Sequence, residues 1–320
     1  MAADRLVVLG TGGTIAGQAT RPDDTVGYTA GVVPIDTLLA GVAVPERWQI
    51  ECEQVAQIDS KDMGPQVWRT LLGRVAHHLA RPEVGGLVIT HGTDTVEETA
   101  YLLQAVLNPA KPVVMTCAMR PASAPSPDGP LNLADALRVA TEAGARGVVL
   151  VCAGRIHGAL QVQKVHPYRL DPFDSGDAGP LGCLEAGQLR RWQPWPDLGP
   201  DFDAGLLSRL LARQDWPRVV WVSNHGGNDG VLVRALVAAQ QSGRQDRPVA
   251  GVVVAGTGNG SLHEDLESAL QAAEAAGMAV RITTRCAQGR VLPQGRGDGL
   301  WPRLALPPAK ARLALMLELL

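Results

Sequence analysis

Short apolar runs rich in β-branched residues recur along the chain, and a glycine-containing turn and a helical stretch follow each one. Continuous apolar runs of this kind are typical of strands buried on both faces of a parallel sheet. We therefore expect strands at Leu6–Leu9, Leu87–Thr90, Val113–Thr116, Val148–Val151, Val219–Val222 and Gly251–Val254.

The stretches between these runs carry apolar residues at helical spacing. In the stretch Leu131–Ala143, four residues fall on one face of a helix: Leu133, Ala136, Leu137 and Ala140. We also expect helices at Asp94–Leu107, Leu232–Gln241 and Leu262–Ala276. Strands that alternate with helices predict a doubly wound α/β fold with a mostly parallel sheet.

The strand–helix pattern breaks between Arg191 and Asp215, where Pro194, Pro196 and Pro200 crowd the chain. A chain of 320 residues is also long for a single core. We expect a larger N-terminal α/β domain (1–190), a linker (191–214) and a smaller C-terminal α/β domain (215–320). Functional residues should follow the strands, because ligands of such sheets bind beyond the carboxyl ends of the strands.

Charge and composition narrow the class of partner. The net charge of −3 shows no excess of basic residues, so we expect neither nucleic acid nor an anionic membrane surface as a partner. The five cysteines are scattered without a Cys-x-x-Cys pair, and the seven histidines form no metal-binding pattern. We expect a cytoplasmic protein with reduced thiols, no metal and no secretory signal.

The first candidate site is the turn after the first expected strand, Gly10-Thr11-Gly12-Gly13-Thr14. It lacks the lysine of a phosphate loop and the G-x-G-x-x-G spacing of a dinucleotide site. A threonine beside free backbone amides combines a nucleophile with an oxyanion cradle, which favours Thr14 as a reacting group. The polar segment Arg21–Gly31 is typical of a lid, and its Tyr28 either packs on the surface or reaches the site when the lid closes.

The second candidate site follows the strand that ends at Thr90. Thr93 or Asp94 can cap the next helix, with Glu97 completing a capping box. Alternatively, the polar cluster binds a substrate at the helix N-terminus, where Asp94 pairs with an ammonium group. His91 has no serine partner in a G-x-S-x-G elbow, so we interpret it as structural. Lys164 is a candidate base that spacing alone does not single out.

The motifs of the chain resemble those of bacterial-type L-asparaginases and glutaminase-asparaginases, chiefly Thr11-Gly12-Gly13-Thr14-Ile15-Ala16 and His91-Gly92-Thr93-Asp94-Thr95. Further matches run in family order across essentially the whole chain. They are Tyr28-Thr29-Ala30-Gly31, Asp59-Ser60-Lys61-Asp62-Met63, Ala118-Met119-Arg120-Pro121, Asp128-Gly129-Pro130-Leu131-Asn132-Leu133, Gly179-Pro180-Leu181-Gly182 and Gly256-Thr257-Gly258-Asn259-Gly260.

The resemblance implies hydrolysis of the asparagine side-chain amide to aspartate and ammonia, without a cofactor. It implies that the catalytic residues are Thr14, Tyr28, Thr93, Asp94 and Lys164, with Thr14 as the nucleophile that attacks the amide carbon and Tyr28 assisting. Formation of a covalent acyl-threonine and direct attack by water are both open. It implies a substrate site formed by Ser60, Asp59, Thr93, Asp94 and Ser261. It also implies a homotetramer, a dimer of intimate dimers, in which a neighbour's C-terminal domain completes each site.

The sequence departs from the family pattern at three places. Lys61 stands where secreted members carry glutamine, and it either adds charge near the substrate carboxylate or faces solvent beside Asp62. Ser261 stands where some asparaginases have asparagine and some glutaminase-active members have serine. No acidic residue lies between Cys286 and Gly297, where the family often supplies a glutamate to the neighbouring site.

Two alternatives to an L-asparaginase stay open. The first is an enzyme with broader amide specificity, either a glutaminase-asparaginase or the amidase subunit of a tRNA-dependent amidotransferase. The amidase subunit is expected to carry an extra N-terminal domain. The second is a non-catalytic α/β module that binds an amino acid or a nucleotide.

Overall fold

The computed structural model describes residues 3–21, 24, 27–199, 203–243, 246–292 and 300–320. The chain folds into two compact units, Met1–Leu211 and Ala212–Leu320. The division falls inside the predicted linker, which contains the short helix α5 (Leu206–Ala212). Trp195, at the start of that predicted linker, is buried in the core of the N-terminal unit.

An eight-stranded mixed sheet forms the centre of the N-terminal unit, in the order β12-β11-β8-β7-β6-β5-β1-β4. The parallel part consists of β4 (Gln49–Ile58), β1 (Arg5–Gly12), β5 (Val84–Thr90), β6 (Pro112–Thr116) and β7 (Gly147–Cys152). The antiparallel part consists of β8 (Arg155–Gly158), β11 (Gly182–Glu185) and β12 (Gln188–Arg191).

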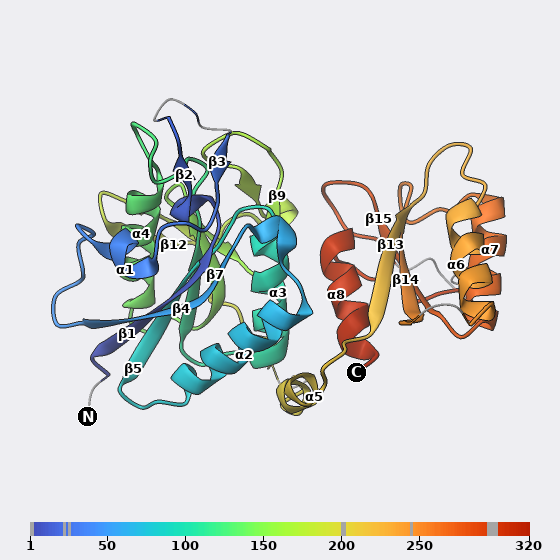
Figure 1. Cartoon of the computed structure of the whole chain (residues 1–320), viewed down its shortest axis with the longest axis horizontal. Coiled ribbons are helices and arrows are strands. Elements are labelled where there is room, and N and C mark those ends of the chain that lie inside the picture. The colour runs from blue at the N-terminus through green and yellow to red at the C-terminus, as the bar shows by residue number, and fades with distance from the viewer. Residues whose placement is uncertain (1–2, 22–23, 25–26, 200–202, 244–245, 293–299) are drawn as a thin grey trace. The chain divides into compact units, whose positions relative to one another are not determined.

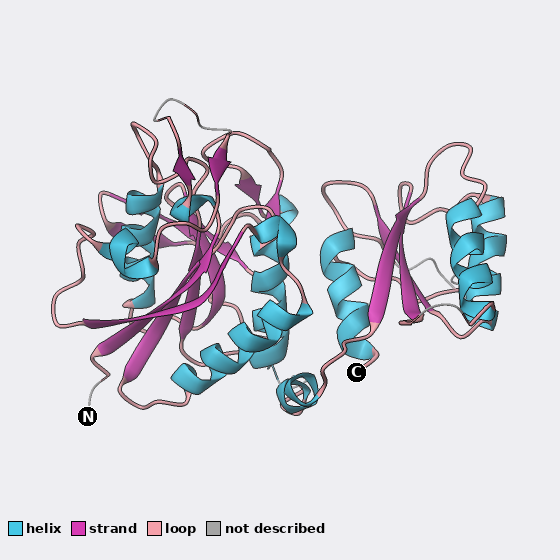
Figure 2. Ribbon diagram, viewed as in Figure 1, coloured by secondary structure: helices cyan, strands magenta, loops and turns pink. Residues whose placement is uncertain are grey.

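Helices cover both faces of this sheet (Figure 1, Figure 2). One face carries α1 (Ile35–Leu39) and α4 (Gly129–Ala140), and the other carries α2 (Pro65–Leu79) and α3 (Val96–Leu107). The right-handed strand–helix–strand connections of a doubly wound fold place helices on both sides in this way.

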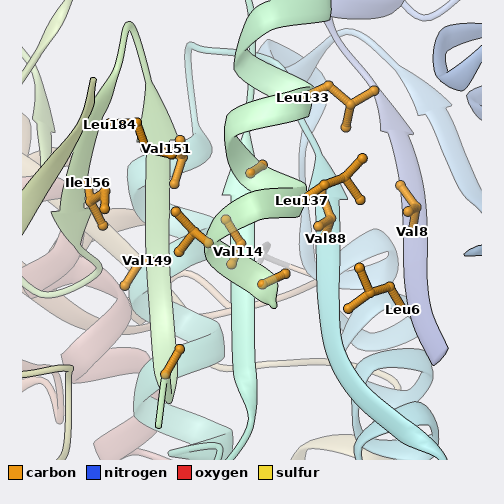
Figure 3. Packing of buried hydrophobic residues seen from close by; sticks show 14 of the residues in the cluster. Leu6, Val8, Val88, Val114, Leu133, Leu137, Val149, Val151, Ile156 and Leu184 are labelled. Atoms are coloured by element: carbon orange, nitrogen blue, oxygen red, sulfur yellow. The ribbon is translucent and has the colours of Figure 1, made fainter. Parts of the chain in front are cut away.

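The core under α4 follows from the helical spacing in the sequence. Leu133 and Leu137 are buried on one face of α4 and point at Val8, Val88 and Val114 of the parallel strands (Figure 3). Each fully buried leucine of this kind contributes about 1.5–3 kcal/mol through removal of apolar surface from water. This packing fixes α4 and the strand ends that carry the site.

The C-terminal unit is a smaller three-layer structure. Its parallel sheet has the order β13-β14-β15, formed by Arg218–Ser223, Val249–Gly256 and Ala279–Thr284. Helices α6 (Val231–Gln241) and α7 (Glu264–Ala275) lie on one face, and α8 (Pro308–Glu318) lies on the other (Figure 1). No helix among the described residues is long and apolar enough to span a bilayer.

The predicted fold class is confirmed: a larger α/β unit with a mixed, mainly parallel sheet precedes a smaller α/β unit. All six expected strands form, and the four expected helices form with ends shifted by up to three residues. The helix expected from Asp94 begins at Val96, because the residues before it turn away to form part of the site described below.

Candidate active site

A cavity of about 410 Å³ lies at the carboxyl ends of the parallel strands. Its polar wall comes from the loops after β1, β4 and β5, which follow three adjacent strands of the sheet. The lining residues all belong to the N-terminal unit and are Thr14, Tyr28, Asp59, Ser60, Thr93, Asp94, Met119, Arg120, Lys164, Pro167, Tyr168 and Leu170.

Thr14 and Tyr28 form the first hydrogen-bonded pair of side chains that line the cavity. Thr14 begins the 3₁₀ turn η1 (Thr14–Ala16), and its hydroxyl lies 2.6 Å from the Tyr28 hydroxyl. The short antiparallel pair β2 (Gln18–Ala19) and β3 (Tyr28–Thr29) returns the chain to bring the two together. Burial raises the pKa of Tyr28, and the nearby carboxylates raise it further against the opposing hydrogen bond to Thr14. Tyr28 is therefore a neutral phenol at pH 7.

The segment expected to be a lid lies partly outside the described residues, at positions 22–23 and 25–26. Tyr28 itself is described and lines the cavity. Of the two interpretations that the sequence left open for Tyr28, the structure supports the one in which its hydroxyl belongs to the site.

Lys164 joins Thr93 and Asp94 in a second group. Its Nζ donates to the Thr93 hydroxyl at 2.8 Å and to Asp94 Oδ1 at 2.6 Å. Lys164 lies in the two-residue strand β9 (Gln163–Lys164), which pairs with β10 (Phe173–Asp174). Seventy-one positions separate Thr93 from Lys164, so only the fold brings them together.

The capping-box interpretation of this loop is wrong. Thr95 is the residue before α3, and no side-chain hydrogen bond caps the helix. The Glu97 carboxylate instead accepts a hydrogen bond from the Lys164 backbone N–H at 2.5 Å. Glu97 thereby anchors β9 to the first turn of α3 and holds Lys164 against Thr93.

Ser60 connects the loop after β4 to the loop after β5. Its hydroxyl oxygen accepts the backbone N–H of Asp94 at 3.2 Å, and its carbonyl accepts the Thr95 hydroxyl at 2.8 Å. Asp59 accepts the backbone N–H of Lys61. The Lys61 ammonium pairs with Asp62, and Lys61 does not line the cavity. Of the two positions that the sequence left open for Lys61, the structure therefore supports the one in solvent beside Asp62.

Two glycines let the two threonine loops approach each other. Gly13 has a φ of 82°, in the left-handed region that favours glycine. A Cβ on Gly13 would lie 2.3 Å from the backbone N and Cα of Gly92. A side chain at either position would therefore push Thr14 and Thr93 apart.

His91 supports the second loop from beneath. The ring is fully buried, with Nδ1 2.8 Å from the Gly92 carbonyl and Nε2 3.0 Å from the Thr99 hydroxyl. The Trp68 indole N–H donates to the same hydroxyl at 2.9 Å. The Thr99 hydroxyl accepts the indole N–H and donates its own proton to Nε2 of His91, while Nδ1 donates to the Gly92 carbonyl. This pattern requires a neutral His91 with its proton on Nδ1. Burial lowers the pKa of His91 to about 4, and His91 does not line the cavity, so its interpretation as structural agrees with the geometry.

Ser261 belongs to the C-terminal unit, in the turn that follows β14. It forms an isolated antiparallel bridge with Thr257, and its carbonyl also accepts the Asn224 side-chain amide at 3.1 Å. Its predicted contact with substrate stays a prediction. Residues 293–299, which include the last part of the segment without acidic residues, lie outside the described part of the chain.

Sequence reasoning gave no role to five residues that line the cavity: Met119, Arg120, Pro167, Tyr168 and Leu170. Met119 and Arg120 follow β6, so the rule that ligands lie beyond strand ends was a usable signal for them. The other three lie in the segment after Lys164, which carries no comparable pattern. Within the described residues, no three His, Cys, Asp or Glu side chains are placed to hold a metal ion.

Two family models together match almost the whole chain. The model described as "Asparaginase, N-terminal" matches residues 5–195, and the "Glutaminase/Asparaginase C-terminal domain" model matches residues 218–320.

Individual proteins are similar over the same length. L-asparaginase 2 of Bacillus subtilis (strain 168) is 35% identical over 324 residues, which span 98% of this chain and 81% of that protein. The glutaminase-asparaginase of Pseudomonas fluorescens biotype A is 35% identical over 329 residues, 98% of this chain and 86% of that protein. The crystal structure of a probable cytoplasmic L-asparaginase from Campylobacter jejuni has a TM-score of 0.87 at 35% identity, covering 99% of this chain and 95% of that chain.

Proposed function

The chain belongs to the asparaginase family, as its motifs predicted, and we propose that it hydrolyses the side-chain amide of L-asparagine to L-aspartate and ammonia with Thr14 as nucleophile. One observation carries the mechanistic part of this proposal. The Thr14–Tyr28 pair and the Thr93–Lys164–Asp94 group line the same cavity.

In the first step, the Thr14 oxygen attacks the amide carbon, and the C–N bond breaks with transfer of a proton to the departing ammonia. Because the pKa of Tyr28 is raised, a free phenolate is disfavoured. Tyr28 therefore relays a proton, accepting that of Thr14 while passing its own to the leaving nitrogen. Backbone amides of the glycine-rich loop and of Thr93 stabilise the negative charge that develops on the carbonyl oxygen.

In the second step, water cleaves the ester on Thr14 and releases aspartate. The Thr93 hydroxyl, hydrogen-bonded to the Lys164 ammonium, orients this water, accepts its proton and passes its own proton to the departing Thr14 oxygen. The Lys164 ammonium also stabilises charge on the oxyanion, because it is only 17% exposed and so is poorly screened by solvent.

The same loops supply groups for the two charged ends of an amino acid. The Asp94 carboxylate suits the α-ammonium group. The Ser60 hydroxyl accepts the Asp94 backbone N–H, so its own proton is available for the α-carboxylate. Asp59 also lines this part of the cavity, and we assign it to the ammonium end.

Ammonia release from L-asparagine tests the proposal, with wild type compared with Thr14→Ala, Thr14→Ser and Thr93→Ala. Loss of a nucleophile or a proton-handling group should lower kcat by about 10²–10⁴ or more, while Thr14→Ser, which keeps the hydroxyl, should retain measurable activity. If Thr14→Ala turns over at the wild-type rate, Thr14 is not the nucleophile. If wild type releases no ammonia, the chain is a binding module.

L-glutamine measured in the same assay tests the broader specificity. A relative named glutaminase-asparaginase is as similar to the chain as the L-asparaginase 2 described above, and Ser261 is the residue that we associate with this difference. We expect asparagine to be the preferred substrate. A kcat/KM for glutamine equal to that for asparagine would replace the assignment with glutaminase-asparaginase.

We also propose a homotetramer in the cytoplasm, with Ser261 acting in a site completed by a second subunit. The scattered cysteines and the similarity to a probable cytoplasmic L-asparaginase support the compartment. Light scattering coupled to size exclusion tests the assembly, and activity in osmotic-shock fractions tests the compartment. A monomer with full activity would contradict the homotetramer, and activity in the periplasmic fraction would contradict the cytoplasmic location.

A further inference from the structure

The chain segment between β9 and β10 forms one wall of the cavity. This segment, residues 165–172, begins directly after Lys164 and contributes Pro167, Tyr168 and Leu170 to the lining. Its base is closed by the Pro172 carbonyl, which accepts the backbone N–H groups of Val165 at 2.8 Å and of residue 166 at 3.3 Å. The wall is therefore a hairpin loop continuous with the strand that carries the lysine.

Burial does little to fix the conformation of this loop. Tyr168 is 66% exposed and Leu170 is 38% exposed, although both line the cavity. Exposed side chains gain little from removal of apolar surface, so a defined loop conformation has to come from hydrogen bonds.

The His166 side chain supplies two of these hydrogen bonds, both within the loop. Its Nδ1 accepts the backbone N–H of Tyr168 and the backbone N–H of Arg169, both at 2.9 Å. Both donors are backbone amides, so Nδ1 is the unprotonated nitrogen of the ring. A side chain that accepts from the second and third following residues closes a tight turn, as aspartate and asparagine do elsewhere.

We propose that His166 is a positioning residue, which holds Pro167, Tyr168 and Leu170 as a preformed wall over the bound amino acid. This inference rests on the proposed function, because it assigns the cavity to an amino acid. The wall places apolar and aromatic surface opposite the polar groups on the sheet side of the cavity. A preformed wall removes the entropic cost of ordering the loop at each binding event.

Electrostatics agrees with a position of Tyr168 close to the reacting pair. The pKa of Tyr28 is raised mainly by burial, and Tyr168 is among the groups that add to the rise. Among the described residues, no hydrogen bond joins Tyr168 or His166 to Thr14 or Lys164. His166 should therefore affect binding much more than the chemical steps.

Two substitutions test separately the hydrogen-bond acceptor of His166 and the bulk of its ring. His166→Asn places Oδ1 where the histidine has Nδ1 and so keeps an acceptor for both amides. His166→Phe keeps a ring of similar size but has no acceptor. We expect His166→Phe to raise KM for L-asparagine and Kd for L-aspartate about five- to tenfold, with kcat within about twofold, because two partly exposed hydrogen bonds are lost. We expect His166→Asn to stay within about twofold of wild type.

Calorimetric titration with L-aspartate distinguishes failure of this inference from failure of the proposed function. If wild type binds L-aspartate but releases no ammonia, the proposed function fails, and the Kd values of the two variants still decide the role of His166. Equal constants for the two variants, at unchanged unfolding temperatures, would overturn the inference. A wild type that neither binds L-aspartate nor hydrolyses asparagine would overturn both.

Discussion

Gly92→Ala should damage the active site without changing any proposed catalytic group. Gly92 lies between His91 and Thr93, and its φ is not positive, so alanine can adopt the backbone conformation. The obstacle is space. A Cβ at this position would lie 2.4 Å from Ser60 Oγ, 2.7 Å from Ser60 Cβ and 3.0 Å from the Cα of Gly13.

The expected magnitude follows from these distances. Carbon atoms in contact prefer about 3.5–4.0 Å, so Ser60 has to move by roughly 1 Å. That shift breaks the contacts of Ser60 with the Asp94 backbone N–H and the Thr95 hydroxyl. Overpacking of this kind costs about 1–3 kcal/mol of stability, and a misplacement of 1 Å costs about 10²-fold in rate.

The assay is kcat/KM for ammonia release, measured together with the unfolding temperature. Gly226→Ala is the matched control, because no atom lies within 4 Å of its Cβ position and its φ is not positive. We expect about a 10²-fold fall for Gly92→Ala and no change for Gly226→Ala. If Gly92→Ala keeps wild-type kcat/KM, the contact between the two loops does not set the catalytic geometry.

Two further changes test the supports of the fold. Thr99→Val should cost about 2–3 kcal/mol in denaturant unfolding, because it removes the buried hydroxyl that accepts the Trp68 indole N–H and hydrogen-bonds Nε2 of His91. An unchanged midpoint would contradict this network. The hydrogen bond from Arg81 lowers the pKa of Glu51 from 4.5 to about 2, so the stabilisation is complete above pH 4.5 and is lost as the pH falls towards 2. Glu51 is 35% exposed, which reduces the contribution to about 1 kcal/mol. Wild type should lose that much more stability than Glu51→Gln between pH 6 and pH 2, and equal losses would contradict this role of Glu51.

The parallel part of the sheet could be predicted from the sequence, whereas its antiparallel extension could not. The buried strands are marked by continuous β-branched runs such as Val148–Val151. The extension is built from strands of four residues, and in β8 only Ile156 is an apolar member of the core. Such short strands are held by their neighbours in the sheet, so no local pattern distinguishes them from loops.

The position of Thr14 and Thr93 at the cavity could be predicted from their loops, because a glycine-rich strand end carries a local signature. The partner of Thr93 could not be inferred in the same way, because Lys164 lies in a two-residue strand with no pattern of its own. The family resemblance identified Lys164, and the tertiary contact with Glu97 explains its position. Glu97 was misassigned because helix-capping rules consider only its own helix.

The two halves of the site differ in how firmly the structure holds them. Lys164 is held through both its ammonium group and its backbone N–H, by Thr93, Asp94 and Glu97. Among the described residues, the strand that carries Tyr28 pairs with β2 at two positions, and the Tyr28 side chain hydrogen-bonds Thr14. Electrostatic stabilisation of an oxyanion requires groups that are fixed before the reaction, whereas a nucleophile covered by a tyrosine has to admit substrate. The rigid group therefore suits charge stabilisation and water activation, and the lightly held pair suits the first attack.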